Sequence, residues 1–242
     1  MAAGYDGVWF LGFNTNKDIF GDSNGKSVRK AFQYAVNRKY ICNEIIKDDF
    51  VPTGAIPKGM DGYDGVTEGY PLDTNASMAL LRKAGYSKRD KRLSGLILAH
   101  TDGAKTIEIA NFIQNGLKKI GIKVELKQIK YSEGENWEDY LSSGKYHLFL
   151  MGYKLLPKPD MPTAEAISSK RLLSDLFGSD GEANFFFLRD QKVDSALDAI
   201  DSLPTTEASA ITNHLRSLNK YLQDLSLAVN LFYIKRIPGL EN

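Results

Sequence analysis

Residues 93–129, LSGLILAHTDGAKTIEIANFIQNGLKKIGIKVELKQI, decide the fold class. The first eight form a short apolar run typical of a buried strand, and residues 104–120 repeat apolar side chains at helical spacing. The inner face of that helix is predicted to carry Ile107, Ala110, Ile113, Leu117 and Ile120. Gly121 ends the helix, and residues 122–129 alternate apolar and charged side chains as a strand does. Together they predict a βαβ unit with parallel strands and a right-handed crossover.

The flanking sequence extends the same pattern. Ser27 is predicted to cap a helix over 28–36, and Asp73 or Thr74 to cap a helix that stops at Gly85. Further helices are expected over 38–47, 137–141, 190–202 and 206–224, and further strands over 8–14, 147–151 and 227–234. The sequence therefore predicts an α/β fold, with a mixed and mostly parallel sheet flanked by helices, in a single lobe that spans residues 1–242.

The stretch YHLFLMGYKLLPKPDMP, residues 146–162, is the candidate binding segment. Its first part is apolar without alternation, which is typical of a central strand covered on both faces. The strand gives way at Gly152 and Tyr153 to a loop rich in proline. Ligands of open α/β sheets bind beyond the carboxyl ends of the strands, so we expect this loop to face a ligand.

No motif for catalysis or metal binding occurs in the chain. The three histidines, His100, His147 and His214, lie on separate predicted elements, and neither an HExxH nor a G-x-S-x-G pattern is present. The stretch HTDGAKT, residues 100–106, lacks the glycine spacing that a phosphate-binding loop needs. Cys42 is the single cysteine and lies on an apolar helical stripe. We therefore expect no catalytic residue, no metal and no cofactor.

Composition and charge narrow the functional classes to which the protein can belong. With 31 basic and 30 acidic residues the formal net charge is +1, which argues against a nucleic-acid partner. No run of eighteen apolar residues is present, so no membrane-spanning helix is expected. The first ten residues, MAAGYDGVWF, have neither the basic nor the apolar region of a signal peptide, and we expect a mature fragment or an excised domain.

Several stretches, taken in order, carry a resemblance to a known family. These are LGFNT at 11–15, VRKAFQYAVNRKYI at 28–41, GAIPKGM at 54–60, YPLDTNASMALLRKAGY at 70–86, IEIANFIQNGLKKIGIKVE at 107–125 and LAVNLFYI at 227–234. Each pattern alone is weakly specific, but the occurrence of all six in this order along the chain is a specific signal. The sequence resembles the C-terminal lobe of the bacterial extracellular solute-binding proteins of family 5, the peptide and nickel class.

The resemblance implies one lobe of a type II periplasmic-binding-protein-like fold. It implies the substrate-binding component of an ABC importer, which encloses a peptide or related small ligand between two lobes without chemical conversion. The expected partners are that ligand, the transporter permease and an N-terminal lobe of the same protein, which this chain lacks. A periplasmic or extracellular location is expected, with lipid anchoring of the full-length protein as one option.

The resemblance also implies a set of ligand-binding residues. They are Asn14, Gly152, Tyr153, Lys154, Leu155, Leu156 and Asp160. Peptide-binding members hold the amino terminus of the ligand with an Asp that follows a Gly-Trp pair. Here Gly152 and Tyr153 stand in the places of that pair, and an ungapped match puts Leu156 where the Asp belongs. Asp160 is the nearest acid, so the ligand class stays open between a peptide and another small solute.

Two other functions are kept as alternatives. Similar domains follow DNA-binding modules in some transcription regulators, which makes a ligand sensor the second reading. A hydrolase or transferase on an α/β scaffold is the third. Sequence upstream of this chain separates the first two, and a turnover assay separates the third.

Overall fold

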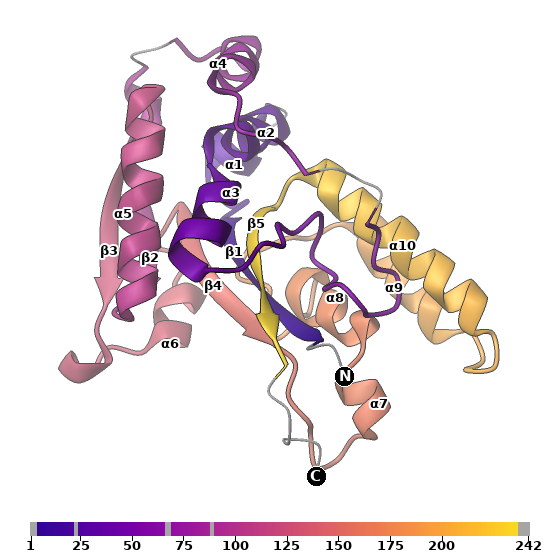
Figure 1. The fold of residues 1–242 in the computed structure, drawn as a ribbon. Coiled ribbons are helices and arrows are strands. Elements are labelled where there is room, and N and C mark those ends of the chain that lie inside the picture. Colours follow the sequence, from indigo (N-terminus) through magenta and orange to yellow (C-terminus); the bar gives the residue numbers. More distant parts are fainter. Residues whose placement is uncertain (1–3, 22–23, 66–68, 88–89, 237–242) are drawn as a thin grey trace.

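The computed structural model describes residues 4–21, 24–65, 69–87 and 90–236, and it places one five-stranded sheet between two layers of helices (Figure 1). The strands are β1 (Tyr5–Phe13), β2 (Ser94–Thr101), β3 (Lys123–Ile129), β4 (Leu148–Lys154) and β5 (Ala228–Lys235). Their order across the sheet is β3-β2-β4-β1-β5. Strand β2 is parallel to β3 and β4, whereas β1 is antiparallel to both β4 and β5. The sheet is therefore mixed, as predicted, but only two of its four strand pairings are parallel, whereas the sequence predicts a mostly parallel sheet.

One layer of helices covers the face of the sheet to which Leu11, Leu98 and Leu150 point. It contains α1 (Asp18–Gly21), α2 (Gly25–Ala35), α3 (Arg38–Tyr40), the π-helix η1 (Ile41–Ile46), α4 (Thr74–Lys83) and α5 (Ala104–Lys119). Their buried side chains join one core cluster with Leu11, Leu98 and Leu150 of the strands. A short 3₁₀ turn, η2 (Lys91–Leu93), leads into β2.

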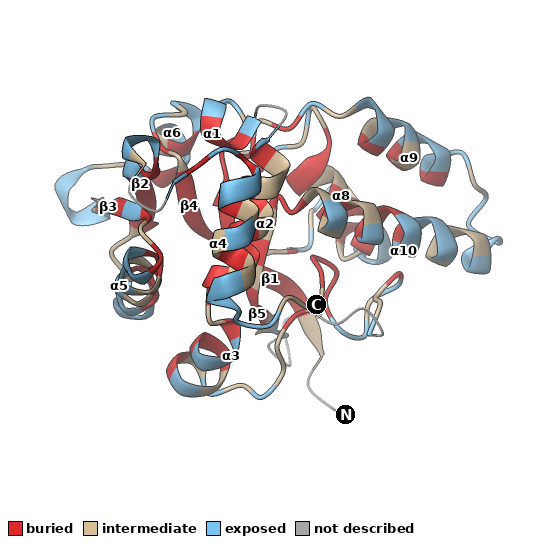
Figure 2. Ribbon diagram, turned by 90° about the horizontal axis from the view of Figure 1, so that it is seen from above, coloured by how far each residue is buried: buried red, intermediate tan, exposed pale blue. Residues whose placement is uncertain are grey.

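The second layer covers the opposite face. It contains α6 (Trp137–Ser142), α8 (Ser169–Phe177), α9 (Gln191–Asp201) and α10 (Ala208–Leu225). These helices bury a second cluster around Phe10, Phe149 and Phe186. The 3₁₀ turn η3 (Tyr131–Glu133) follows β3, and the short helix α7 (Thr163–Ala166) follows β4. Figure 2 shows the buried residues gathered on the strands and on the helix faces turned toward them.

Strand β4 lies at the centre of the sheet, and its sequence explains why. Leu148 and Leu150 join the first core cluster, while Phe149 and Met151 join the second. Because alternate side chains of a strand point to opposite faces, a strand covered on both faces must be apolar throughout. The prediction of a central, doubly covered strand is confirmed.

Most helices and strands lie within a few residues of their predicted bounds, but some details differ. Asp73 caps α4, as predicted, by accepting from the backbone N–H groups of Asn75 and Ala76. Helix α2 begins at Gly25 instead of after Ser27, so Ser27 does not cap it. The predicted inner face of α5 is wrong at Ile107, which is half-buried, while Ile109 is buried. Both residues flank the apolar stripe, and the neighbouring elements decide which flank is covered.

Candidate ligand-binding site

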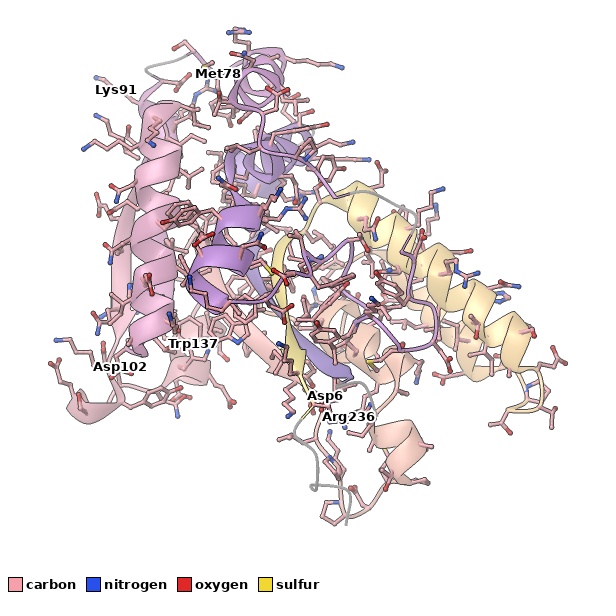
Figure 3. All side chains as sticks on the ribbon, viewed as in Figure 1. Asp6, Met78, Lys91, Asp102, Trp137 and Arg236 are labelled. Atoms are coloured by element: carbon pink, nitrogen blue, oxygen red, sulfur yellow. The ribbon has the colours of Figure 1, made fainter. Side chains whose placement is uncertain are left out.

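The carboxyl ends of the parallel strands meet at one edge of the sheet, which we call the carboxyl edge. The antiparallel strand β1 begins there, so Tyr5 pairs with Lys235 at the end of β5, and Gly7 pairs with Lys154 at the end of β4. The backbone N–H of Arg236 donates to the carbonyl of Gly4 at 2.8 Å. Figure 3 shows Asp6 and Arg236 side by side at this edge. The outer ends of β1 and β5 therefore adjoin the loop that follows β4.

Gly152 of β4 makes room for an aromatic side chain of β1. It pairs with Trp9, and a Cβ atom at Gly152 would overlap the Trp9 indole. Trp9 in turn stacks on Phe232 of β5, with ring centroids 5.7 Å apart and planes 15° apart. The glycine is thus required by the close approach of a ring, on the sheet face opposite to the Tyr153 ring.

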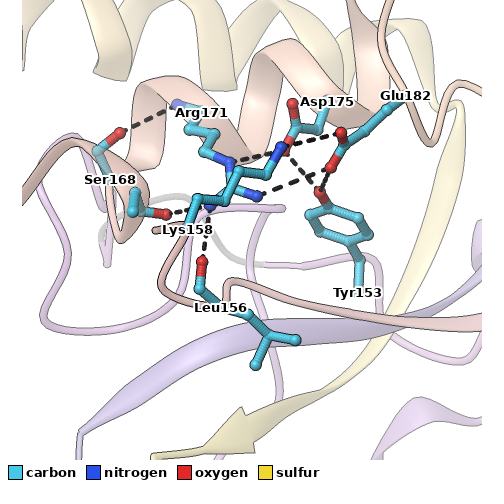
Figure 4. A network of polar contacts seen from close by, with 8 residues as sticks. Tyr153, Leu156, Lys158, Ser168, Arg171, Asp175 and Glu182 are labelled. Carbon is cyan, nitrogen blue, oxygen red and sulfur yellow. Dashed lines mark hydrogen bonds and ion pairs between the residues drawn. The ribbon is translucent and has the colours of Figure 1, made fainter. Parts of the chain in front are cut away.

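Tyr153 lies in a network of charged side chains (Figure 4). Its hydroxyl lies 2.6 Å from Asp175 Oδ2 and 3.1 Å from Glu182 Oε1, and either oxygen can accept a hydrogen bond from it. Arg171 Nε lies 3.2 Å from the same Asp175 oxygen, and Lys158 Nζ lies 3.0 Å from Glu182 Oε2. Two cations therefore neutralise the two acids, and neither acid is left unpaired for a ligand.

Burial raises the pKa of Tyr153, and its hydrogen bond to Asp175 raises it further. The hydrogen bond from Lys158 lowers the pKa of the Glu182 carboxyl, although Glu182 is half-exposed. Tyr153 consequently stays protonated and donates, while Glu182 stays charged and accepts. This arrangement fixes the orientation of the ring.

Arg171 also holds the loop after β4. Its Nη1 atom donates to the carbonyl oxygens of Leu156 and Ala166, at 2.9 Å and 2.7 Å. Because only 10% of the Arg171 side chain is exposed, these bonds lie largely out of water. One guanidinium thereby ties both ends of the loop 156–166 to helix α8.

The rest of the loop divides into anchored and exposed residues. Leu155 is buried and its backbone N–H donates to the carbonyl of Asp6, while Lys154 Nζ lies 3.6 Å from Asp6 Oδ2. Leu156 is 58% exposed. Asp160 is also exposed, and it makes no hydrogen bond or ion pair with any described residue. The loop therefore presents apolar Leu156 and two carboxylates without a described partner, those of Asp160 and of Glu165 on α7, to solvent.

Asn14 is not brought together with the other six predicted site residues. It follows Phe13, which pairs with Leu148 at the start of β4, and so lies at the opposite edge of the sheet. Its side chain is buried and donates to the carbonyls of Gly144 and Tyr146, at 3.2 Å and 3.0 Å. These bonds fasten the turn that enters β4, because an amide can satisfy two backbone carbonyls at once.

Sequence reasoning missed the residues that support the site. They are Asp6, Lys158, Arg171, Asp175 and Glu182. Ser168 followed by SKRLLSDLF was a readable signal for helix α8, in which Ser168 caps the backbone and Arg171 and Asp175 lie one turn apart. No pattern in the sequence joins that helix to Tyr153, because their contact is made only in the folded chain.

The histidines are dispersed in the structure. His100 is buried with Nδ1 2.8 Å from the Thr101 carbonyl, His147 lies at the start of β4, and His214 is exposed on α10. Across the described residues, no three His, Cys, Asp or Glu side chains are grouped so that they could bind a metal ion. Within that same part of the chain, no helix has the length and apolar character needed to cross a bilayer.

Comparison with known proteins decides the family. The sequence pattern of the bacterial extracellular solute-binding proteins, family 5 (middle region), matches residues 2–171. The chain belongs to this family. The oligopeptide-binding protein OppA of Lactococcus lactis subsp. cremoris is 26% identical over 261 residues, covering 98% of this chain and 41% of OppA. A di/tripeptide-binding protein of Pseudomonas aeruginosa is 27% identical over half of the chain. This family-5 chain thus spans less than half the length of these relatives.

Solved structures agree with the fold. The oligopeptide-binding protein AppA of Bacillus subtilis, in complex with a nonapeptide, gives a TM-score of 0.77 at 18% identity, over 96% of this chain and 45% of AppA. DppA of Helicobacter pylori, in complex with the peptide STSA, gives 0.78 at 19% identity over 96% of this chain. The family-5 chain therefore has the fold of one part of a type II periplasmic binding protein, and the predicted fold class is confirmed.

Proposed function

We propose that this chain is the ligand-binding lobe of the substrate-binding component of an ABC importer. It takes a peptide or a related small ligand at its carboxyl edge and converts nothing. The observation that carries the proposal is the loop 156–166, which Arg171 fastens at that edge beside the outer ends of β1 and β5. To enclose a ligand between two lobes, each lobe must offer a rigid wall, and the chain segments that connect the lobes must lie next to that wall.

The named relatives support the ligand class and the partners. OppA and the solved AppA and DppA complexes are peptide-binding proteins by name, and none is named as an enzyme. The partners that follow are an N-terminal lobe of the same protein, which closes over the carboxyl edge, and the transporter permease. The whole protein is then periplasmic or extracellular, as members of the family are.

Within this proposal the predicted residues take separate roles. Tyr153 and Gly152 form the fixed wall, Lys154 and Leu155 anchor the loop to β1, and exposed Leu156 meets an apolar part of the ligand. Asp160 is the carboxylate that meets the ammonium group of a peptide, since Asp6, Asp175 and Glu182 are paired with cations of the protein and Glu165 lies further along the loop, on α7. A charge-assisted hydrogen bond to Asp160 offsets the desolvation of that ammonium.

The test uses the two-lobed protein in which this chain is completed by its N-terminal lobe. Calorimetry compares a tetrapeptide with its N-acetylated form, and Asp160→Asn is compared with the exposed control Asp198→Asn on α9. We expect Asp160→Asn and N-acetylation each to weaken binding about tenfold, by removing one charged hydrogen bond, with no effect of the control.

Two outcomes separate the parts of this proposal. If the acetylated and free peptides bind equally tightly, Asp160 does not hold the ammonium, although the binding function stands. If the completed protein binds no peptide and instead turns over an ester or amide, the binding function itself is overturned.

A further inference from the structure

A cavity lies away from the carboxyl edge, and what its lining residues can bind is independent of the proposed function. It measures about 250 Å³ and lies between helix α10, the start of β5 and the loop segments around Thr53 and Tyr70. Ala228 and Asn230 of β5 line it, whereas the carboxyl edge lies at the other end of that strand, at Lys235. The walls combine apolar side chains such as Phe177 with a group of carboxamides.

Three of those carboxamides have buried polar atoms without a partner among the described residues. Asn219 is 1% exposed, and neither its Nδ2 nor its Oδ1 has a hydrogen-bond partner among the described residues. The same holds for Nε2 of Gln223, one turn further along α10, and for Oδ1 of Asn230. Buried polar atoms of native proteins are almost always hydrogen-bonded, because an unmade bond costs about 1–3 kcal/mol. Their concentration around one cavity indicates groups that can bind a ligand.

Arg38 adds a positive charge to the same wall. It is 6% exposed, and its guanidinium donates only to the backbone carbonyls of Pro52 and Tyr70, at 3.1 Å and 2.6 Å. Its Nε has no partner, and no described carboxylate lies within ion-pair distance of it. Burial lowers the pKa of Arg38 to about 10, in keeping with a buried cation that has no counter-ion among the described residues.

The mouth of the cavity keeps this positive character. Lys220 lines it, and Asp224 is the one acid among the described lining residues. Asp224 is already paired with Lys26 and Lys30, at 2.5 Å and 3.8 Å. Among the described lining residues, therefore, no unpaired acid competes for the unpartnered donors of Arg38, Asn219 and Gln223, which are available to an anion, while the amide oxygens of Asn219 and Asn230 are available to a hydroxyl or amino group.

We propose that this cavity binds a small carboxylate that carries a hydroxyl or amino group next to it. The carboxylate accepts from Arg38 and the carboxamide N–H groups, and the neighbouring donor meets an amide oxygen of Asn219 or Asn230. Its volume of about 250 Å³ suits a small hydroxy or amino acid, and not an oligopeptide.

The test is nuclear magnetic resonance titration of the 242-residue chain with three matched probes. Lactate has both groups, propionate lacks the hydroxyl, and lactamide is neutral. We expect lactate to shift the side-chain amide signals of Asn219 and Gln223 saturably, with propionate and lactamide each weaker by about tenfold or more. Gln223→Leu should weaken the binding of lactate by about tenfold, and the exposed control Asn115→Leu on α5 should leave it unchanged.

A second variant guards against a folding defect in the first. Lys220→Glu changes an exposed residue at the mouth, and it should weaken the binding of lactate several-fold while leaving the binding of lactamide unchanged. The control Lys118→Glu on α5 should change neither. Absence of saturable shifts up to about 100 mM lactate would mean that water alone fills the cavity, and would overturn the proposal. Equal binding of lactate and lactamide would overturn the carboxylate assignment.

Discussion

His147 shows how one side chain can take the place of a backbone group. Its backbone N–H donates to the Ile97 carbonyl at 3.0 Å, and its Nδ1 accepts from the Ile97 N–H at 3.1 Å. The side chain therefore completes the pairing of β2 just before β4 begins. Nδ1 can accept only while it carries no proton, so this bond exists only in the form of the ring that is neutral.

The bond makes the stability of the fold sensitive to acid. Burial, with a smaller contribution from Lys17, lowers the pKa of His147 below its ordinary value of 6.5. Below pH 6.5 the unfolded chain binds a proton at this histidine that the folded chain does not bind. The free energy of unfolding therefore decreases as the pH is lowered from 6.5, until the pH passes below the pKa of the folded state. We expect His147→Asn, which keeps an acceptor for Ile97, to reduce this slope in urea titrations between pH 7 and pH 4. The slope should persist in the control His214→Gln, and an unchanged slope in His147→Asn would contradict the assignment.

At the scale of elements, helix α8 governs the loop after β4. Arg171 bonds to the carbonyls at both ends of the loop and forms an ion pair with Asp175, whose side chain is 15% exposed. Removing the cation leaves Asp175 and two carbonyls without their partner, which costs about 3 kcal/mol for a largely buried pair. The loop thus depends on a helix that lies after it in the chain.

Arg171→Gln should free the loop without unfolding the sheet. We expect hydrogen exchange at the amides of residues 155–167 to quicken by about a hundredfold, since about 3 kcal/mol of local stability is lost. Lys170→Gln removes the neighbouring surface pair with Asp201 and is the matched control. Equal exchange in both variants would show that Arg171 does not hold the loop.

At the scale of the whole molecule, the antiparallel strand β1 brings the outer ends of the first and last strands together. Both lie at the carboxyl edge, beside the loop that carries Leu156 and Asp160. A second lobe attached through these strands would lie directly over that loop. Under the proposed function this chain supplies one wall of such an enclosure, so it can make about half of the contacts.

Under the proposed function, the isolated chain is therefore expected to bind peptide far more weakly than a protein completed by the proposed N-terminal lobe. Losing one wall removes contacts and leaves the ligand in water, and we expect a loss of at least about a hundredfold in affinity. Calorimetry with the same tetrapeptide on both forms measures the difference. Micromolar or tighter binding to the 242-residue chain would contradict the requirement for a second lobe.

The sequence by itself determined the class of fold, because local periodicity reflects local burial. The alternation after Gly121, the stripe along α5 and the unbroken apolar run of β4 each state which faces are covered. The family resemblance followed from the order of these segments. The sequence also located the loop after β4, since that loop is contiguous with its strand.

Only the tertiary structure decided which distant residues share a site. Tyr153 meets Asp175 and Glu182, and the loop meets Arg171, through packing of α8 against the sheet, which no local pattern encodes. Asn14 was grouped with the loop by resemblance, yet β1 runs antiparallel to β4 and carries it to the opposite edge. Arg38 of α3 and the carboxamides of α10 and β5 come together at one cavity in the same way. Contacts between segments far apart in the chain depend on strand order and direction, and these are fixed only when the chain folds.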